Sequence, residues 1–437
     1  GVAATYYTTD GSDPRLPNGG ISPTAQVYSS PLTLADTVHI RARVLNGLNS
    51  LGFNRWSAYA DGIYAVDASA LRITEIMYHP APPPIGSPYL PDDFEFIEVQ
   101  NTGATPVDLQ EVHFSRGVTY TFPASILGAG QFAVIAKNPA AFATRYPGVT
   151  VLGTFLGTLS DSGEALSLAD GIGASIVDFT YSDAWYPATD GEGFSLVTNN
   201  ALAPAANWNN KSNWRTSQFV AGNPGAADNG LVVNAVVINE AMSNTTAAIG
   251  DWVELRNTTA SPINIGGWYL SDDKNVRQKF RIPIGTVLAA GGYVVFNQRD
   301  DFGSATNPHA IVPFSFSAVG ANLYLTSVDG GGNLAGYRDD VDFAGADAEV
   351  SFGRYIKSTG GADFVAQVAA TPGAANGAPR VGPIVINELM YAPSLGGDEF
   401  IELRNISGAA VPLYDPAAPA NTWNRSKHDT GTKTVLS

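Results

Sequence analysis

Ile73-Thr-Glu-Ile-Met77, Ile238-Asn-Glu-Ala-Met242 and Ile386-Asn-Glu-Leu-Met390 repeat one pattern, which decides the fold. Each stretch is followed by a second shared one: Phe96-Ile-Glu-Val-Gln-Asn101, Trp252-Val-Glu-Leu-Arg-Asn257 or Phe400-Ile-Glu-Leu-Arg-Asn405. The two glutamates are fourteen positions apart in the later copies, and the first copy carries a proline-rich insertion at residues 79–93. Landmarks that recur in one order indicate tandem duplication.

The copies also end alike. The first finishes with Asn223-Pro-Gly-Ala-Ala-Asp228 and the second with Thr371-Pro-Gly-Ala-Ala-Asn376. These endings predict repeats at residues 69–228 and 230–378, followed by a partial third copy at residues 379–437. The first copy has Val112 where the second has Trp268, so we expect its core to be filled differently.

The composition favours strands joined by turns. The chain has 437 residues with 46 Gly and 28 Pro, and its apolar runs are short and rich in β-branched and aromatic residues. Only residues 139–146 suggest a helix. We therefore predict an all-β chain of immunoglobulin-like β-sandwiches, and the short junctions near residues 228 and 378 favour a semi-rigid rod.

Charge and composition exclude several classes of partner and chemistry. The net charge of −16 argues against nucleic acid and anionic membrane surfaces, because both would be repelled. No apolar run is long enough for a membrane helix, so we expect no membrane insertion. The absence of cysteine removes disulfides and thiolate chemistry. No zinc, serine-hydrolase or P-loop motif occurs, so we expect a chain that is not an enzyme.

The repeated motifs, together with Gly266-Gly-Trp-Tyr-Leu-Ser271, resemble the lamin tail domain. That resemblance implies an immunoglobulin-like sandwich of the kind found in nuclear lamins and in large bacterial extracellular proteins, and hence a secreted or cell-surface location. Residues 1–66 differ. Tyr6-Tyr-Thr-Thr-Asp-Gly-Ser-Asp-Pro14 and His39-Ile-Arg-Ala-Arg-Val44 resemble the small β-sandwich at the C-terminus of chitobiases and β-hexosaminidases, with its first strand missing. Such modules accompany spore-coat-H-like kinase domains.

The repeated glutamates are the first candidate site. In a regular strand Ile73, Glu75 and Met77 project to one face, and Glu98 on the neighbouring strand would lie within about 5 Å of Glu75. A retaining glycosidase uses two carboxylates at that separation. A structural role explains better why the pair recurs three times, with each glutamate held by an arginine or by backbone N–H groups. The repeat-defining glutamates are Glu75, Glu98, Glu240, Glu254, Glu388 and Glu402.

Two further kinds of site are predicted from side-chain type. Calcium prefers clustered oxygen ligands, and the candidate ligands are Asp272, Asp273, Asp339, Asp340 and Asp342, although aspartates in turns are the alternative interpretation. Trp208 and Trp214 fall in loop-like segments and would form a glycan-stacking platform if exposed, although such aromatic residues more often pin the loop itself. Calcium is the one cofactor considered.

These features favour a non-catalytic extracellular scaffold or adhesive stalk whose partners are flanking domains or other subunits. The alternative is a carbohydrate-binding accessory region of a polysaccharide-processing enzyme or of a protein with a kinase domain. The incomplete third copy predicts either a longer protein or completion by strand exchange between subunits, as in a filament.

Overall fold

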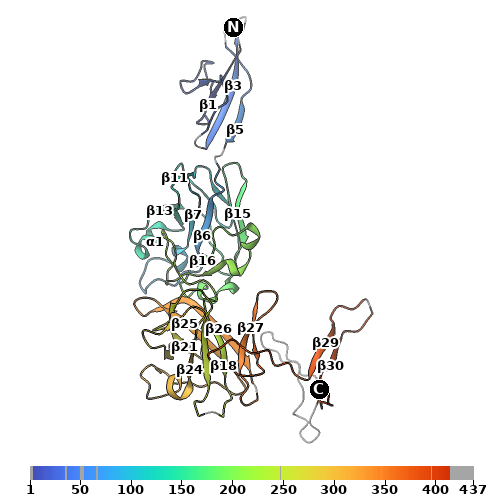
Figure 1. Ribbon diagram of the computed structural model, residues 1–437. Coiled ribbons are helices and arrows are strands. Elements are labelled where there is room, and N and C mark those ends of the chain that lie inside the picture. The colour runs from blue at the N-terminus through green and yellow to red at the C-terminus, as the bar shows by residue number, and fades with distance from the viewer. Residues whose placement is uncertain are drawn as a thin grey trace.

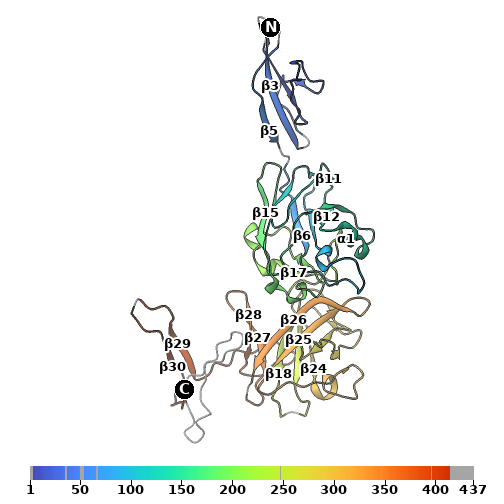
Figure 2. The same ribbon diagram turned by 180° about the vertical axis from the view of Figure 1, so that it is seen from behind.

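The computed structural model describes residues 3–34, 37–49, 54–64, 67–246, 248–345, 347–394 and 396–413. The predicted all-β architecture is confirmed: strands dominate every unit, and the one α-helix in the described part of the chain is α1 (Pro139–Arg145), where the sequence suggested a helical turn. The N-terminal unit, the first repeat and the second repeat follow one another, while a hairpin from the third copy lies beside the second repeat (Figures 1 and 2). No helix among the described residues is long and apolar enough to span a membrane.

The N-terminal unit is one five-stranded sheet. Its strands are β1 (Ala4–Thr8), β2 (Gln26–Val27), β3 (Val38–Leu48), β4 (Asn54–Trp56) and β5 (Ala60–Tyr64). The long β3 pairs with β1 on one edge and with both β4 and β5 on the other. All five strands described in this unit belong to one hydrogen-bonded sheet, and the two-layer module expected for residues 1–66 stays a prediction.

The first repeat is a two-layer sandwich. One sheet has the order β13-β12-β7-β6-β16-β17, the other β10-β9-β14-β15, and β8 pairs with β11 beside them. Its strands are β6 (Leu71–Met77), β7 (Phe96–Asn101), β8 (Val107–Asp108), β9 (His113–Arg116), β10 (Tyr120–Thr121), β11 (Ile126–Leu127), β12 (Phe132–Ala136), β13 (Val151–Thr154), β14 (Ala165–Ala169), β15 (Ser175–Thr180), β16 (Leu196–Thr198) and β17 (Trp214–Thr216). Buried apolar side chains of both sheets form one core between the layers.

The second repeat has the same strand order, except that its described residues include no counterpart of β13. Its sheets run β24-β19-β18-β27-β28 and β22-β21-β25-β26, with β20 paired to β23. Its strands are β18 (Val236–Met242), β19 (Trp252–Asn257), β20 (Ile263–Asn264), β21 (Tyr269–Ser271), β22 (Phe280–Arg281), β23 (Val287–Leu288), β24 (Tyr293–Asn297), β25 (Gly320–Val328), β26 (Leu334–Ala344), β27 (Phe352–Ile356) and β28 (Ala362–Ala366). From the third copy the structure describes β29 (Ile384–Met390) and β30 (Phe400–Asn405), which pair as β18 and β19 do.

A β-bulge interrupts the first strand of each copy. The register shifts between Ile73 and Glu75, and equivalent shifts occur in β18 and β29. The bulge resets the alternation of side chains, so Ile73 and Ile76 enter the main core while Met77 packs in a smaller cluster with Phe96. The prediction that Ile73, Glu75 and Met77 share one face is therefore wrong.

The asparagine that ends the second motif stabilises the loop that follows it. Asn257 is buried, and its Nδ2 donates to the carbonyl oxygens of Ser261 at 2.7 Å, Leu288 at 3.2 Å and Ala289 at 3.0 Å. Asn101 makes the equivalent bonds in the first repeat. Leu288 is buried, so its carbonyl needs a donor inside the protein, and the same amide also holds two carbonyls nearer the surface.

We expect Asn257→Ala to lower the free energy of unfolding of the second repeat by about 2–4 kcal/mol, because it removes a buried amide and the three hydrogen bonds that the amide donates. Urea unfolding followed by tryptophan fluorescence measures the change. Asn275→Ala, an exposed asparagine of the same repeat whose side chain makes no hydrogen bond in the described structure, is the matched control. Equal stability of the two variants would contradict the role given to Asn257.

Candidate functional site

The repeated glutamates face each other across adjacent strands, as predicted. Glu75 of β6 is the register partner of Glu98 of β7, and Glu240 of β18 is the partner of Glu254 of β19. All four carboxylates are buried. Burying two carboxyl groups side by side is costly unless their oxygens receive hydrogen bonds, so their donors explain the motif.

In the first repeat, the donors come from the bulge and from the end of the repeat. Glu98 accepts from the Thr74 hydroxyl at 2.6 Å and from the Gly225 backbone N–H at 2.7 Å. Glu75 accepts from the Asn223 backbone N–H at 3.0 Å and from the hydroxyl of Ser195. The x-Pro-Gly turn, here Asn223-Pro-Gly225, is therefore fastened to the glutamate pair by the backbone on both sides of its proline.

The second repeat makes the same connection. Glu240 accepts from the backbone N–H of Thr371 at 3.0 Å and from its hydroxyl at 2.9 Å. Glu254 accepts from the backbone N–H of Gly373 and from the side-chain amide of Asn239 at 2.7 Å. The two motif strands and the x-Pro-Gly turn thus form one buried unit that closes each repeat.

This geometry argues against the glycosidase hypothesis for the pair. A catalytic acid and nucleophile must both reach the substrate. The oxygens of Glu75 and Glu98 are buried and directed at backbone N–H groups of the same chain. The pair therefore fits a structural connection made by backbone and hydroxyl donors, as the threefold repetition suggested, and no arginine among the described residues hydrogen-bonds to it.

The third pair differs in its surroundings. Glu388 and Glu402 are register partners, and Asn387 donates its side-chain amide to Glu402 as Asn239 does to Glu254. Both glutamates are exposed, because the described residues place no x-Pro-Gly turn against them.

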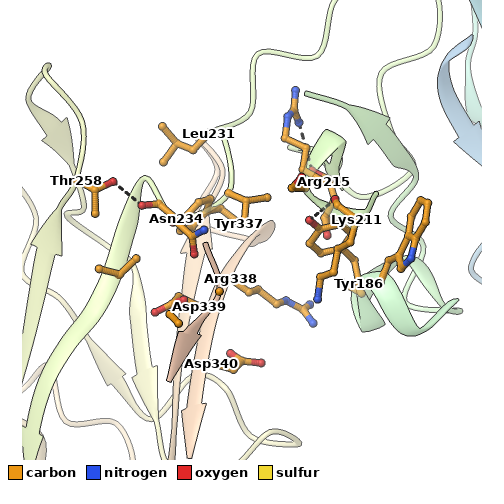
Figure 3. Close-up of a pocket in the computed structure, with 18 of the residues that line it drawn as sticks. Tyr186, Lys211, Arg215, Leu231, Asn234, Thr258, Tyr337, Arg338, Asp339 and Asp340 are labelled. Atoms are coloured by element: carbon orange, nitrogen blue, oxygen red, sulfur yellow. Dashed lines mark hydrogen bonds between the residues drawn. The ribbon is translucent and has the colours of Figure 1, made fainter. Parts of the chain in front are cut away.

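A cleft of about 870 Å³ lies where the two complete repeats meet. Figure 3 shows Arg338 reaching from β26 toward Tyr186 and Lys211 of the first repeat. Arg338 forms a paired contact with Glu192, with nitrogen–oxygen distances of 3.0 and 2.6 Å. The Lys211 ammonium lies 4.9 Å from the centroid of the Tyr186 ring. The cleft wall thus combines cations with a half-buried aromatic ring.

Comparison with known protein families assigns both repeats. The Lamin Tail Domain model matches residues 65–183 and 226–337, together more than half of the 437 residues. The chain belongs to the lamin tail domain family. The Fn3 associated model matches residues 3–50, the region whose sequence resembles a chitobiase module. Neither the search of curated proteins nor the search of solved structures found a match.

The two tryptophans considered as a glycan platform lie in the core of the first lamin tail repeat. Trp208 and Trp214 are buried, and the Trp214 ring stacks on Phe179 with centroids 4.8 Å apart. Their indole N–H groups donate to the carbonyls of Ala203 and Trp208. These indoles are not exposed and do not form a platform, because they fill this core, in which Val112 takes the position that Trp268 has in the second repeat.

Most of the predicted calcium ligands form ion pairs with basic side chains or accept hydrogen bonds from the backbone. Asp272 pairs with Lys279 at 2.6 Å, Asp339 with Arg354 at 2.6 Å and Asp340 with Arg277 at 3.0 Å. Asp273 accepts from the backbone of Asn275, as expected of an aspartate in a turn, and Asp342 lies further along β26. Across the described ranges, no group of three or more His, Cys, Asp or Glu side chains is placed to hold a metal ion. Calcium binding stays an untested prediction, and this geometry does not favour it.

Sequence reasoning missed the residues that join the two lamin tail repeats. Gly336 lies inside β26, and its N–H donates to the carbonyl of Gln218 at 3.1 Å. A Cβ at this position would lie 1.9 Å from the Ser217 carbonyl oxygen. A glycine inside a strand is a known sign of close backbone approach, so this position carried a signal, whereas Arg338 and Glu192 carried none.

Burial shifts the titration of the first glutamate pair. Removal from water, with the neighbouring Glu98 carboxylate adding to it, raises the pKa of Glu75, and burial raises the pKa of Glu98. One oxygen of Glu75 has no hydrogen-bond partner among the described residues. Burial also raises the pKa of nearby Glu95, to about 7.

We expect the first repeat to lose stability as the pH rises from 5 to 9. Since the folded pKa values lie above the ordinary carboxyl value of 4.5, the folded state binds more protons than the unfolded state in this window. Stability is then fully present below about pH 4.5 and is lost as the pH rises through the raised values. Glu75→Gln stays neutral, so its melting temperature should fall less over the window. Calorimetry at several pH values measures this, with exposed Glu111→Gln as control. If Glu75→Gln and the unaltered chain show the same pH dependence, the assignment fails.

Proposed function

We propose that this chain is a non-catalytic structural scaffold, a stiff array of lamin tail repeats that works as a secreted or cell-surface spacer. The junction between the two complete repeats is the observation that supports it most. A spacer holds its two ends at a defined distance only if neighbouring repeats keep a fixed orientation. Short linkers limit the rotation between repeats but do not remove it.

At the junction, the two repeats touch through backbone atoms. Gly336 of β26 lies against the chain that follows β17, where its N–H bonds to Gln218. Arg338, two residues along β26, binds Glu192 through two nitrogen–oxygen contacts. A bidentate arginine–carboxylate pair restricts orientation more than a single contact does. The hydrogen bond and the ion pair together resist rotation about the linker.

The linker itself is anchored. Asp228 follows the x-Pro-Gly turn of the first repeat, and its carboxylate binds the buried guanidinium of Arg215 at 2.5 Å and the Gln218 backbone N–H at 2.8 Å. An unpaired buried charge would be strongly destabilising, so this pairing holds the end of the first repeat in place. The linker then leads within a few residues into β18. This arrangement supports a rigid connection.

Distances between spin labels test the stiffness directly. The chain has no cysteine, so Ile172→Cys in the first repeat and Ile284→Cys in the second give two exposed labelling sites. We expect a narrow distance distribution between them. Gly336→Ala should broaden it, because the added methyl group cannot fit against the Ser217 carbonyl.

Gly330→Ala is the matched control, because a Cβ at that turn position of the same repeat meets nothing within 4 Å. The control should leave the distribution narrow. A broad distribution in the otherwise unaltered chain, or equal broadening by both substitutions, would contradict the rigid spacer.

The inter-repeat cleft supports a second candidate function, binding of a polysaccharide with acidic sugars: the net charge of −16 repels polyanions from the chain as a whole, but the cleft holds a cation of its own. Lys211 lies over the Tyr186 ring and, in the described part of the chain, forms no ion pair with a carboxylate. An aromatic ring beside an uncompensated cation suits a sugar that carries a carboxylate or sulfate group. The other basic side chains of the cleft, such as Arg338 and Arg277, are already paired with acidic residues.

Affinity electrophoresis in gels containing pectate or neutral cellulose ether tests this candidate. We expect retardation by pectate alone, weakened by salt because the attraction is between charges. Lys211→Met should reduce the retardation, while Lys274→Met, an exposed lysine of the second repeat, should not. Equal retardation by both gels, or by both variants, would reject the candidate.

A further inference from the structure

We propose that two copies of this chain form a dimer by pairing along the outer edge of β24. The inference goes beyond the spacer function and does not rest on it, because flexible and stiff chains alike can pair through one strand. It rests on a difference between the two complete repeats that lies within residues 293–319, all of which are described.

In the first repeat, the chain covers this edge itself. β13 pairs in parallel with β12, and Val134 is the partner of Val151. Val134 and Ala136 are buried there. β24 is the counterpart of β12, because each pairs with the second motif strand of its repeat in the same register. Val295 therefore corresponds to Val134, but it is partly exposed.

The second repeat uses the equivalent segment differently. Residues 298–319 join β24 to β25, as the segment with α1 and β13 joins β12 to β14. They place Phe302, Phe314 and Phe316 in the core, where the rings of Phe302 and Phe314 stack with centroids 4.8 Å apart. No strand among the described residues pairs with the outer edge of β24. The edge is open because the connecting segment packs into the core.

Hydrogen bonds at the two ends of β24 determine which of its backbone groups face outward. The Gln298 N–H donates to the Asp251 carbonyl, and the Asn257 N–H donates to the Gly292 carbonyl. Because bonding alternates along an antiparallel pair, the even-numbered residues of β24 bond to β19 and the odd-numbered ones face away from it. Val295, at the centre of β24, therefore offers both an N–H and a carbonyl to a new strand.

The other edges of the second repeat have partners. Backbone hydrogen bonds join β22 to residues 309–312 and β28 to residues 378–380, and β26 meets the first repeat at Gly336. Proteins cover sheet edges because an open edge pairs readily with another chain. Within the described ranges, β24 is thus the edge of this repeat that no backbone segment covers.

Opposite charges at the two ends of β24 favour a second copy as the partner. Arg256 lies over the Tyr293 ring, 5.3 Å from its centroid, and its buried Nε has no hydrogen-bond partner among the described residues. At the other end, Asp301 binds the Asn297 N–H at 2.8 Å. Antiparallel pairing about Val295 brings the Arg256 end of each copy beside the Asp301 end of the other, as two-fold symmetry requires.

Val295→Cys tests this pairing, because the chain has no cysteine of its own. In the dimer the two substituted residues form a hydrogen-bonded pair with Cα atoms about 5.5 Å apart, which is within disulfide range. We expect mild oxidation of the complete chain to give a disulfide-linked dimer at about 0.15 M salt, which screens the repulsion between two chains of net charge −16. Val319→Cys, 87% exposed before β25, is the control and should stay monomeric.

Val295→Lys should weaken self-association at least about tenfold, because it places two like charges opposite each other at the centre of the contact. Sedimentation at several concentrations measures this. Val319→Lys adds the same charge elsewhere in the repeat and should associate as the unaltered chain does. Neither side chain belongs to the core of the repeat, so both variants should melt as the unaltered chain does. A monomeric unaltered chain, equal cross-linking of the two cysteine variants, or equal association of the two lysine variants would overturn the proposal.

Discussion

Two carboxyl groups buried on neighbouring strands are the constraint on which the rest of each repeat depends. Glu75 and Glu98, like Glu240 and Glu254, cannot be buried without donors, and the donors come from a turn more than a hundred residues further along the chain. The hydrogen bonds therefore couple the first two strands of the repeat to its last residues. The x-Pro-Gly sequence suits this task, since proline sets the backbone between two donors and glycine adopts the positive φ found at Gly225 and Gly373.

The same connection places the beginning of the next repeat. The turn of the first repeat leads to Asp228, whose pairing with Arg215 fixes the chain before β18 begins. Gly336 of the second repeat then meets Gln218, between β17 and the turn, and Arg338 meets Glu192, which lies just before β16. Closure of one unit and orientation of the next are thus parts of one hydrogen-bonded network, which is a physical reason for treating the array as a spacer.

In the third hairpin, the described residues include no x-Pro-Gly turn, so comparison with the complete repeats shows what that turn contributes. Its motif strands pair in the same register, so local pairing does not require the turn. Its apolar side chains are nevertheless exposed, whereas their counterparts in the second repeat lie in the core. Strand pairing is local and forms from nearby residues, but burial of the hairpin needs strands that arrive from a distance.

The sequence by itself determined the all-β class, the tandem repeats and the facing glutamates, because period-two strands and repeated motifs are local patterns. It did not reveal the bulge at Thr74, which depends on a hydrogen bond to Glu98 across the sheet. Only the tertiary structure decided that Trp208 and Trp214 are core residues, because loop-like sequence does not say which space a side chain fills. It also decided that Asp339 faces Arg354 and that Asp340 faces Arg277. In the same way, only the structure shows that Gly336 touches the other repeat. No sequence motif predicts these contacts, because each joins residues far apart along the chain with no recurring spacing.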